Sequence, residues 1–94
     1  MHQAPTVSEI DAIHRLFLAA RGDGAMSEVV AKALLSTWRP EVHGHLNVIA
    51  LRELSEAQRS DVIVVLGYVI SAGHGLDELG LEKDMAAIAK LWGN

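Results

Sequence analysis

The chain has 94 residues, half of them apolar and 21% charged, and it carries a formal net charge of −4. This length and composition predict one folded domain with a modest core, and they exclude extensive disorder. The acidic balance argues against non-specific binding to nucleic acid or to an anionic membrane surface, since both need clustered Lys and Arg. The absence of cysteine excludes disulfides and thiolate metal sites.

The sequence shows no targeting signal. Its first residues lack the basic, apolar and small segments of a signal peptide, and no apolar run approaches the roughly 20 residues that span a bilayer. We therefore expect a cytoplasmic protein that does not cross a membrane. We also expect a single helical domain over residues 1–94, in which residues 1–6 form a flexible N-terminal tail.

Two amphipathic helices are predicted in the first half of the chain. Ser8, with Asp11 three residues later, has the spacing of a capping box and predicts the start of the first helix. The glycines of the segment 21–24 predict the turn that ends it. The second helix is predicted over residues 26–38, and it ends there because Pro40 pushes the preceding residue out of the helical conformation.

The stretch from Ser55 to Gly73 is expected to organise the fold. Its unbroken apolar middle predicts an element that is buried on all sides. The many valines and isoleucines would also suit a strand. However, Ser55 and Gln58 have the capping-box spacing, and Gly73 can adopt the left-handed conformation that ends a helix. These flanks favour a central apolar helix over about residues 55–72.

The remaining elements complete the predicted architecture. A short helix is predicted over residues 46–54, and the last helix over about residues 81–91. Gly67 is expected to allow close approach of the helix that carries Ala31 or Ala33. Because the connections are short, we predict an all-α fold, a compact bundle of four to five helices packed around the central apolar helix.

Three groups of side chains suggest chemistry, and each has a simpler structural interpretation. His43 and His45 could share a metal ion with a third ligand, although a polar turn explains them better. Asp11 and His14, one helical turn apart, could form an acid–base pair, but such pairs are commonly solvated surface contacts. His74 is expected to cap the central helix. Since the chain also lacks a phosphate-binding loop and a nucleophile elbow, we predict no enzyme activity, cofactor, metal or small-molecule substrate.

Two features predict a surface that binds another protein. Trp38 and Arg39 are adjacent and belong to the residue types that anchor interfaces, although Trp38 and Trp92 could instead cap the ends of the core. The second feature is an acidic surface that could occupy the nucleic-acid-binding groove of a target protein, made by Glu9, Asp11, Asp23, Glu28, Asp77, Glu78, Glu82 and Asp84. Its side chains assigned to partner binding are Asp77, Glu78, Glu82 and Asp84. A short apolar chain also has difficulty covering its own surface, so the partner is expected to be another protein or a second copy.

The alternative function is a small DNA-binding regulator of the helix-turn-helix type. The predicted helices at 26–38 and 46–54 lie close together in the sequence, as that motif requires. The second of them offers Asn47 and Arg52 to base edges, but Glu53 opposes these two residues. Because the whole chain is acidic as well, nucleic-acid binding is not the preferred function.

Four segments give the chain its overall pattern, namely RGDGAMSEVVAKALLSTW, HGHLNVIAL, SDVIVVLGYVI and DMAAIAKLW. In this order they resemble a family of small uncharacterised helical proteins from bacteria and their phages and mobile elements. The resemblance covers most of the chain and implies a cytosolic or phage-encoded accessory protein, with no activity to carry over. By analogy with other phage proteins of this size, we expect a non-enzymatic interaction module that inhibits a host protein complex in the host cytoplasm, as anti-CRISPR proteins do.

Overall fold

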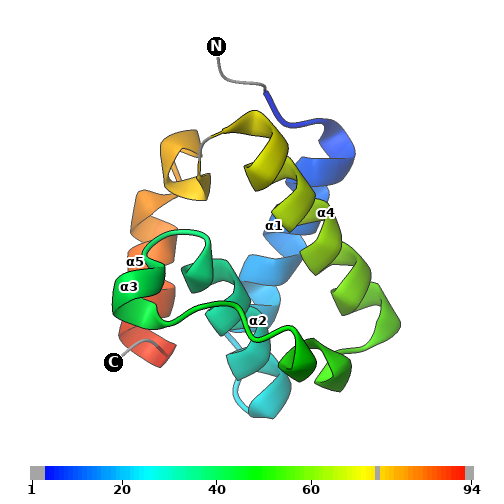
Figure 1. Ribbon diagram of the computed structural model, residues 1–94, viewed down its shortest axis with the longest axis vertical. Helices are drawn as coiled ribbons and strands as arrows, with labels where there is room; N and C mark the ends of the chain where they lie inside the picture. Colours follow the sequence, from blue (N-terminus) through cyan, green and yellow to red (C-terminus); the bar gives the residue numbers. More distant parts are fainter. Residues whose placement is uncertain (1–3, 74, 93–94) are drawn as a thin grey trace.

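The computed structural model describes residues 4–73 and 75–92 and contains only helices and connections in that part of the chain. The α-helices are α1 (Val7–Ala20), α2 (Ala25–Ser36), α3 (Pro40–His43), α4 (Glu56–Ala72) and α5 (Glu82–Trp92). Two short 3₁₀ helices are η1 (Ile49–Glu53) and η2 (Leu76–Leu79). The predicted all-α fold is confirmed, and Figure 1 shows the helices packed around one another in a single body.

The first helix begins earlier than the sequence predicted. The Thr6 hydroxyl accepts a hydrogen bond from the Glu9 backbone N–H at 3.2 Å, and the Glu9 carboxylate accepts one from the Thr6 backbone N–H at 2.8 Å. This capping box replaces the predicted pairing of Ser8 with Asp11, which is wrong, because Thr6 offers the same chemistry two residues earlier. Of the predicted tail, residues 1–3 lie outside the described residues.

Both predicted ends of α4 are confirmed. The Ser55 hydroxyl accepts a hydrogen bond from the Gln58 backbone N–H at 3.2 Å, and the Gln58 side-chain oxygen accepts one from the Ser55 backbone N–H at 3.3 Å. Gly73 follows the helix with φ of 76°, in the left-handed conformation that glycine adopts without steric cost. The local sequence signals therefore fix where α4 starts and where it ends.

The centre of the fold is α2, because it is the helix that contacts most of the other elements. It packs against α1, α3, α4, α5 and η1, and in Figure 1 it lies behind the segment that connects α3 to η1. Its fully or almost fully buried side chains are Val30, Ala31, Ala33, Leu34 and Leu35. Together with the inner face of α1, these residues form most of the hydrophobic core.

The prediction that the apolar run of α4 is buried on all sides is wrong. One face of α4 packs on α1 and, less extensively, on α2, through buried residues at the helical spacing of three and four. On the opposite face, Ile63 is 67% exposed and Ile70 is 80% exposed. The reason is that α1 and α2 cover one side of α4, and no other element of the described chain packs extensively on the other side.

The predicted close packing at Gly67 is also wrong. A Cβ atom added there would meet no described heavy atom within 4 Å beyond its chain neighbours and its own helix backbone. We therefore expect Gly67→Ala to raise the free energy of unfolding by about 1 kcal/mol, because alanine loses less backbone entropy in a helix. Urea unfolding of dilute protein measures this change. A lower free energy of unfolding would mean that Gly67 is closely packed within its own chain.

The segment between α2 and α4 differs from the predicted helix over residues 46–54. Pro40 begins the four-residue helix α3, and Gly44 ends it with φ of 99°. The chain then continues without regular structure to η1, which has only five residues. Leu46 and Leu51 are partly buried against the core, so apolar contacts hold this connection more than regular hydrogen bonding does.

An ion pair fixes α4 against α1. The Arg15 guanidinium donates two hydrogen bonds to the Asp61 carboxylate, from Nε to Oδ2 at 2.8 Å and from Nη2 to Oδ1 at 2.9 Å. Asp61 is buried, while Arg15 is largely exposed along its side chain. The hydrogen bond to Asp61 raises the pKa of Arg15 above its usual value, and the two parallel bonds fix the relative orientation of the helices.

Tyr68, which is the chain's one tyrosine, gives the fold a pH dependence. Burial raises the pKa of its phenol above the ordinary value of 10.0, and the charge of Glu9 raises it further. The contribution of the neutral phenol to stability is therefore complete below the ordinary pKa and is lost as the pH rises through the folded-state pKa. We expect the tyrosinate absorbance of the folded protein to appear at higher pH than that of the urea-unfolded chain. Titration of the folded and unfolded chains at the same pH would contradict this expectation. The Tyr68→Phe variant, which has no tyrosine, gives the background absorbance to subtract.

Within the described chain, no helix combines the length and the apolar character needed to cross a membrane.

The last helix, α5, begins at Glu82 and ends at Trp92, one residue later at each end than predicted. Glu82 and Asp84 lie in its first turn and Lys90 in its last, the order that the helix dipole favours.

Candidate interaction surfaces

The predicted anchors Trp38 and Arg39 form one cluster at the end of α2. The Arg39 guanidinium carbon lies 4.5 Å from the centroid of the Trp38 ring, within cation–π distance. The His43 ring stacks on Trp38 with centroids 5.7 Å apart and an interplanar angle of 22°. Trp38 is therefore half-buried and already contacts two side chains of its own chain, so it offers a partner less free surface than the sequence suggested.

Among the described residues, His43 and His45 gain no third metal ligand. In residues 4–73 and 75–92, no three His, Asp or Glu side chains come together in a group that could hold a metal ion. His43 is occupied by its contact with Trp38, and its buried Nδ1 has no hydrogen-bond partner in the described structure. His74, the predicted cap of α4, lies outside the described residues.

The four acidic side chains assigned to partner binding lie on two consecutive elements. Asp77 and Glu78 are in η2, and Glu82 and Asp84 are in the first turn of α5. Asp84 accepts a hydrogen bond from Arg21 Nη2 at 3.0 Å, which neutralises part of this charge. Of these four side chains, Asp84 therefore already pairs with a cation from the end of α1.

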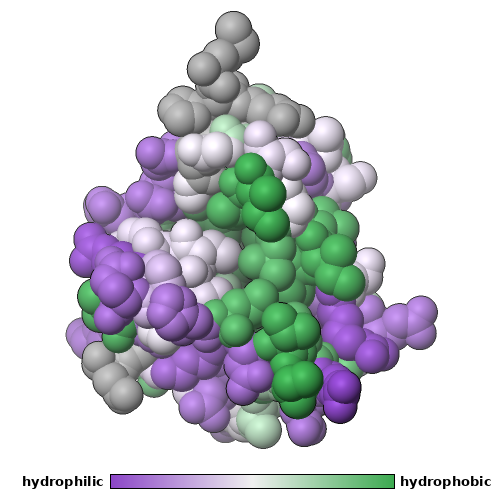
Figure 2. All heavy atoms as spheres, viewed as in Figure 1, coloured by the Kyte–Doolittle hydropathy of each residue, from purple (hydrophilic) through white to green (hydrophobic). Residues whose placement is uncertain are grey.

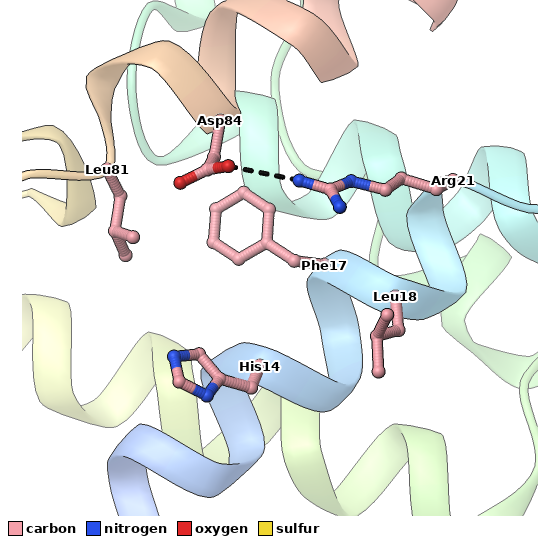
Figure 3. A pocket seen from close by; sticks show the side chains of 6 residues that line it. All are labelled: His14, Phe17, Leu18, Arg21, Leu81 and Asp84. Atoms are coloured by element: carbon pink, nitrogen blue, oxygen red, sulfur yellow. Dashed lines mark hydrogen bonds and ion pairs between the residues drawn. The ribbon is translucent and has the colours of Figure 1, made fainter.

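A hollow with a volume of about 310 Å³ lies beside α1. Figure 3 shows the side chains that surround it, which are His14, Phe17, Leu18, Arg21, Leu81 and Asp84. A second hollow of about 220 Å³ shares His14 and Leu81 with the first, so the two form one groove along the helix. The walls are mainly apolar, and the Arg21–Asp84 ion pair closes one side.

In the described chain, no hydrogen bond or ion pair joins His14 to Asp11, the predicted acid–base partner. No serine or threonine lines either part of the groove, so His14 has no hydroxyl nucleophile to activate there. The Arg21 guanidinium is neutralised by Asp84, which leaves it a weaker anion site than a free arginine would be.

The second extended surface is apolar and includes the outer face of α4, defined by Ser60, Ile63, Val64, Gly67, Ile70 and Ser71. Figure 2 shows a band of hydrophobic surface that runs over α4 and the segment around η1. Val48 and Ile49, at the start of η1, are both well exposed. The band contains no charged residue on the outer face of α4 between Ser60 and Ser71.

Two depressions lie at the edges of α2. The first is lined by side chains of α1, α2 and α4 that are apolar except for Thr37. The second, of about 250 Å³, lies between α2 and the segment that carries Leu46 and Leu51, and its lining also includes the polar residues Glu28, Lys32 and Asn47. The buried Ala33 of α2 lines both depressions.

The model of a family of unknown function, DUF7673, matches residues 10–93. The chain belongs to this family. The match includes α2 to α5 completely and all but the first turn of α1, so both surfaces described above lie within the DUF7673 region. This confirms the resemblance to an uncharacterised family. No curated protein and no solved structure matches the chain.

Proposed function

We propose that this DUF7673 protein is a non-enzymatic module that binds a protein partner, either another protein or a second copy of this chain, through the outer face of α4. The observation that carries the proposal is the exposure of Ile63 and Ile70, which lie seven residues apart on the same side of the helix. Full burial of one isoleucine side chain contributes about 1.5–3 kcal/mol. Since both side chains are at least two-thirds exposed, their burial by a partner would contribute about 2–4 kcal/mol together.

The finer form of the proposal is an accessory protein of a phage or mobile element that inhibits a host complex in the host cytoplasm, as anti-CRISPR proteins do. Its support is analogy in size, together with the net charge of −4, which suits a basic partner. The acidic residues of η2 and α5 would then attract the basic partner toward the apolar contact. The apolar face has the stronger support, because Asp84 already pairs with Arg21.

A DNA-binding regulator has less support than a protein-binding module. The helix-turn-helix hypothesis needs a recognition helix over residues 46–54, and that segment contains only the five-residue η1. Such a helix is too short to place several side chains along a major groove. Arg52 is exposed there, but Glu53 beside it opposes a phosphate contact.

Photo-crosslinking tests the proposed function. A photoreactive amino acid is placed at Ile70 in the producing cells, and a control chain carries it at Leu91, which is 60% exposed on α5. We expect one discrete adduct from position 70 and none from position 91. We also expect Ile63→Glu to abolish the adduct, because a charge on the same face would have to be desolvated. The absence of an adduct from position 70 would overturn the proposal.

A further inference from the structure

We propose that the partner on the outer face of α4 is a second copy of this chain, and that the two α4 helices pair antiparallel and cross at Gly67. This inference rests on the proposed function, because it names the partner of the same surface. It is carried by three properties of α4, namely its lack of charge, the space above Gly67 and the area of the apolar band.

The outer face of α4 suits contact with an identical surface. In a two-fold dimer the same patch meets itself, so charges on the patch come close to charges of the same sign. The chain has a net charge of −4, and the outer surfaces of α1 and α5 carry charged side chains along their length. Between Ser60 and Ser71, by contrast, α4 presents only apolar, glycine and hydroxyl side chains to solvent. Self-association there meets no like-charge repulsion on the patch itself.

Gly67 gives the pairing its register. It lies in the middle of the exposed face, and no described atom of its own chain occupies the space in which its side chain would stand. Glycine is unfavourable within a helix, and close approach of another backbone is one reason to find it there. Val64 and Ile70 lie three residues to either side. Antiparallel crossing at Gly67 therefore places each Ile70 opposite the partner subunit's Val64, beside the notch that glycine leaves.

The area of the apolar surface suits a weak dimer. At 1.5 Å per residue the uncharged segment from Ser60 to Ser71 is about 18 Å long, and a helix with its side chains is about 10 Å wide. Its outer face therefore covers on the order of 200 Å² per chain. The exposed side chains of Val48 and Ile49 add to this area. A two-fold pair then buries less than about 1,000 Å², the area that a stable specific interface needs, so we expect a dimer that dissociates readily on dilution.

Light scattering over a concentration series tests the pairing. We expect the mass to rise toward twice that of one chain, and Gly67→Leu to weaken association at least tenfold by filling the notch. Because leucine favours helix and meets open space in the monomer, Gly67→Leu should fold normally by circular dichroism. Leu91→Glu, on another helix, should dimerise like the natural chain. A mass of one chain at all concentrations, or unaltered association of Gly67→Leu, would overturn the inference.

A single introduced cysteine tests the register. The natural chain has no cysteine, so any disulfide in Gly67→Cys must join two chains. At the crossing point the two Cα atoms lie within the separation of about 4–7 Å that a disulfide requires. We expect rapid oxidation to a covalent dimer for Gly67→Cys and much slower oxidation for Leu91→Cys. Equal rates would contradict crossing at Gly67.

The outcome also separates this inference from the proposed function. A monomeric chain whose position 70 cross-links to a different protein overturns the second-copy inference and leaves the proposed function standing. A monomeric chain with no adduct at position 70 overturns both. An adduct that contains only this chain, together with a dimer in solution, supports the inference.

Discussion

Replacing Leu35 with alanine is expected to lower the free energy of unfolding by about 3 kcal/mol. Leu35 lies on α2, at the centre of the fold, and its side chain is completely buried. The substitution removes buried apolar atoms and leaves a cavity, which together cost about 2–5 kcal/mol for a core leucine. In a domain of this size the expected loss corresponds to a melting temperature lower by roughly 12–24 °C. Thermal and urea unfolding monitored by circular dichroism measure it.

The matched control for Leu35→Ala is Ile70→Ala in α4. Ile70 belongs to the longest apolar run in the sequence, yet its side chain is mostly exposed. We expect a change of less than about 0.5 kcal/mol in dilute protein, as for other surface substitutions. If Ile70→Ala costs as much as Leu35→Ala, then α4 is the buried centre of the fold, and its outer face is not available to a partner.

Replacing Trp92 with alanine is expected to have the second largest effect. The Trp92 indole N–H donates a hydrogen bond to the Ala20 carbonyl at 2.7 Å, which joins the end of α5 to the end of α1. Its ring also packs against the core. Since the ring is partly buried, we expect Trp92→Ala to lower the free energy of unfolding by about 2–3 kcal/mol, toward the lower end for large aromatic truncations.

Trp92→Phe separates the hydrogen bond from the packing. Phenylalanine keeps most of the ring contact but leaves the Ala20 carbonyl without its indole donor, so we expect a loss of about 1 kcal/mol. Urea unfolding of the two variants beside the natural chain gives both values. Equal losses for the two variants would assign the whole effect to the hydrogen bond, and no loss in either would contradict the role of Trp92 in fixing α5.

Local signals in the sequence predicted the limits of α4 correctly, because they depend on neighbouring residues alone. Ser55 and Gln58 cap each other, and Gly73 adopts its left-handed conformation, whatever packs on the helix. The predicted capping box of Ser8 with Asp11 was wrong, because Thr6 and Glu9 form the capping box two residues earlier. Capping boxes are therefore predictable to within a turn, and their exact position depends on which pair forms the better hydrogen bonds.

The burial of α4 was predicted wrongly because hydrophobicity does not show what covers a residue. Its buried positions recur mostly every three or four residues and include Asp61 and Tyr68. An unbroken run of apolar residues does not reveal this spacing, because exposed and buried positions are apolar alike. Gly67 between Ile63 and Ile70 was the available signal, since small and hydroxyl residues line that side of the helix. The exposed face, on which the proposed function rests, became visible only when the positions of α1 and α2 were known.

Contacts between distant residues carried no sequence signal. Trp38 and Arg39 were predicted as one cluster because they are adjacent, whereas the stacking of His43 depends on the turn that Pro40 begins. The ion pair of Arg15 with Asp61 joins residues 46 positions apart, and a single sequence gives no means of pairing them. The groove beside α1 likewise depends on how α5 docks.

Solvent exposure of the isoleucine methyl groups tests the central claim that α4 leaves one face open for a partner. NMR signals of Ile63 and Ile70 are recorded with a soluble paramagnetic probe, with the exposed Leu91 and the buried Ile88 as references. In dilute protein we predict strong broadening of Ile63 and Ile70, as for Leu91, and protection of both as the protein concentration rises. Protection equal to that of Ile88 at every concentration would contradict the open face, and broadening that never decreases would contradict its use in binding a second chain.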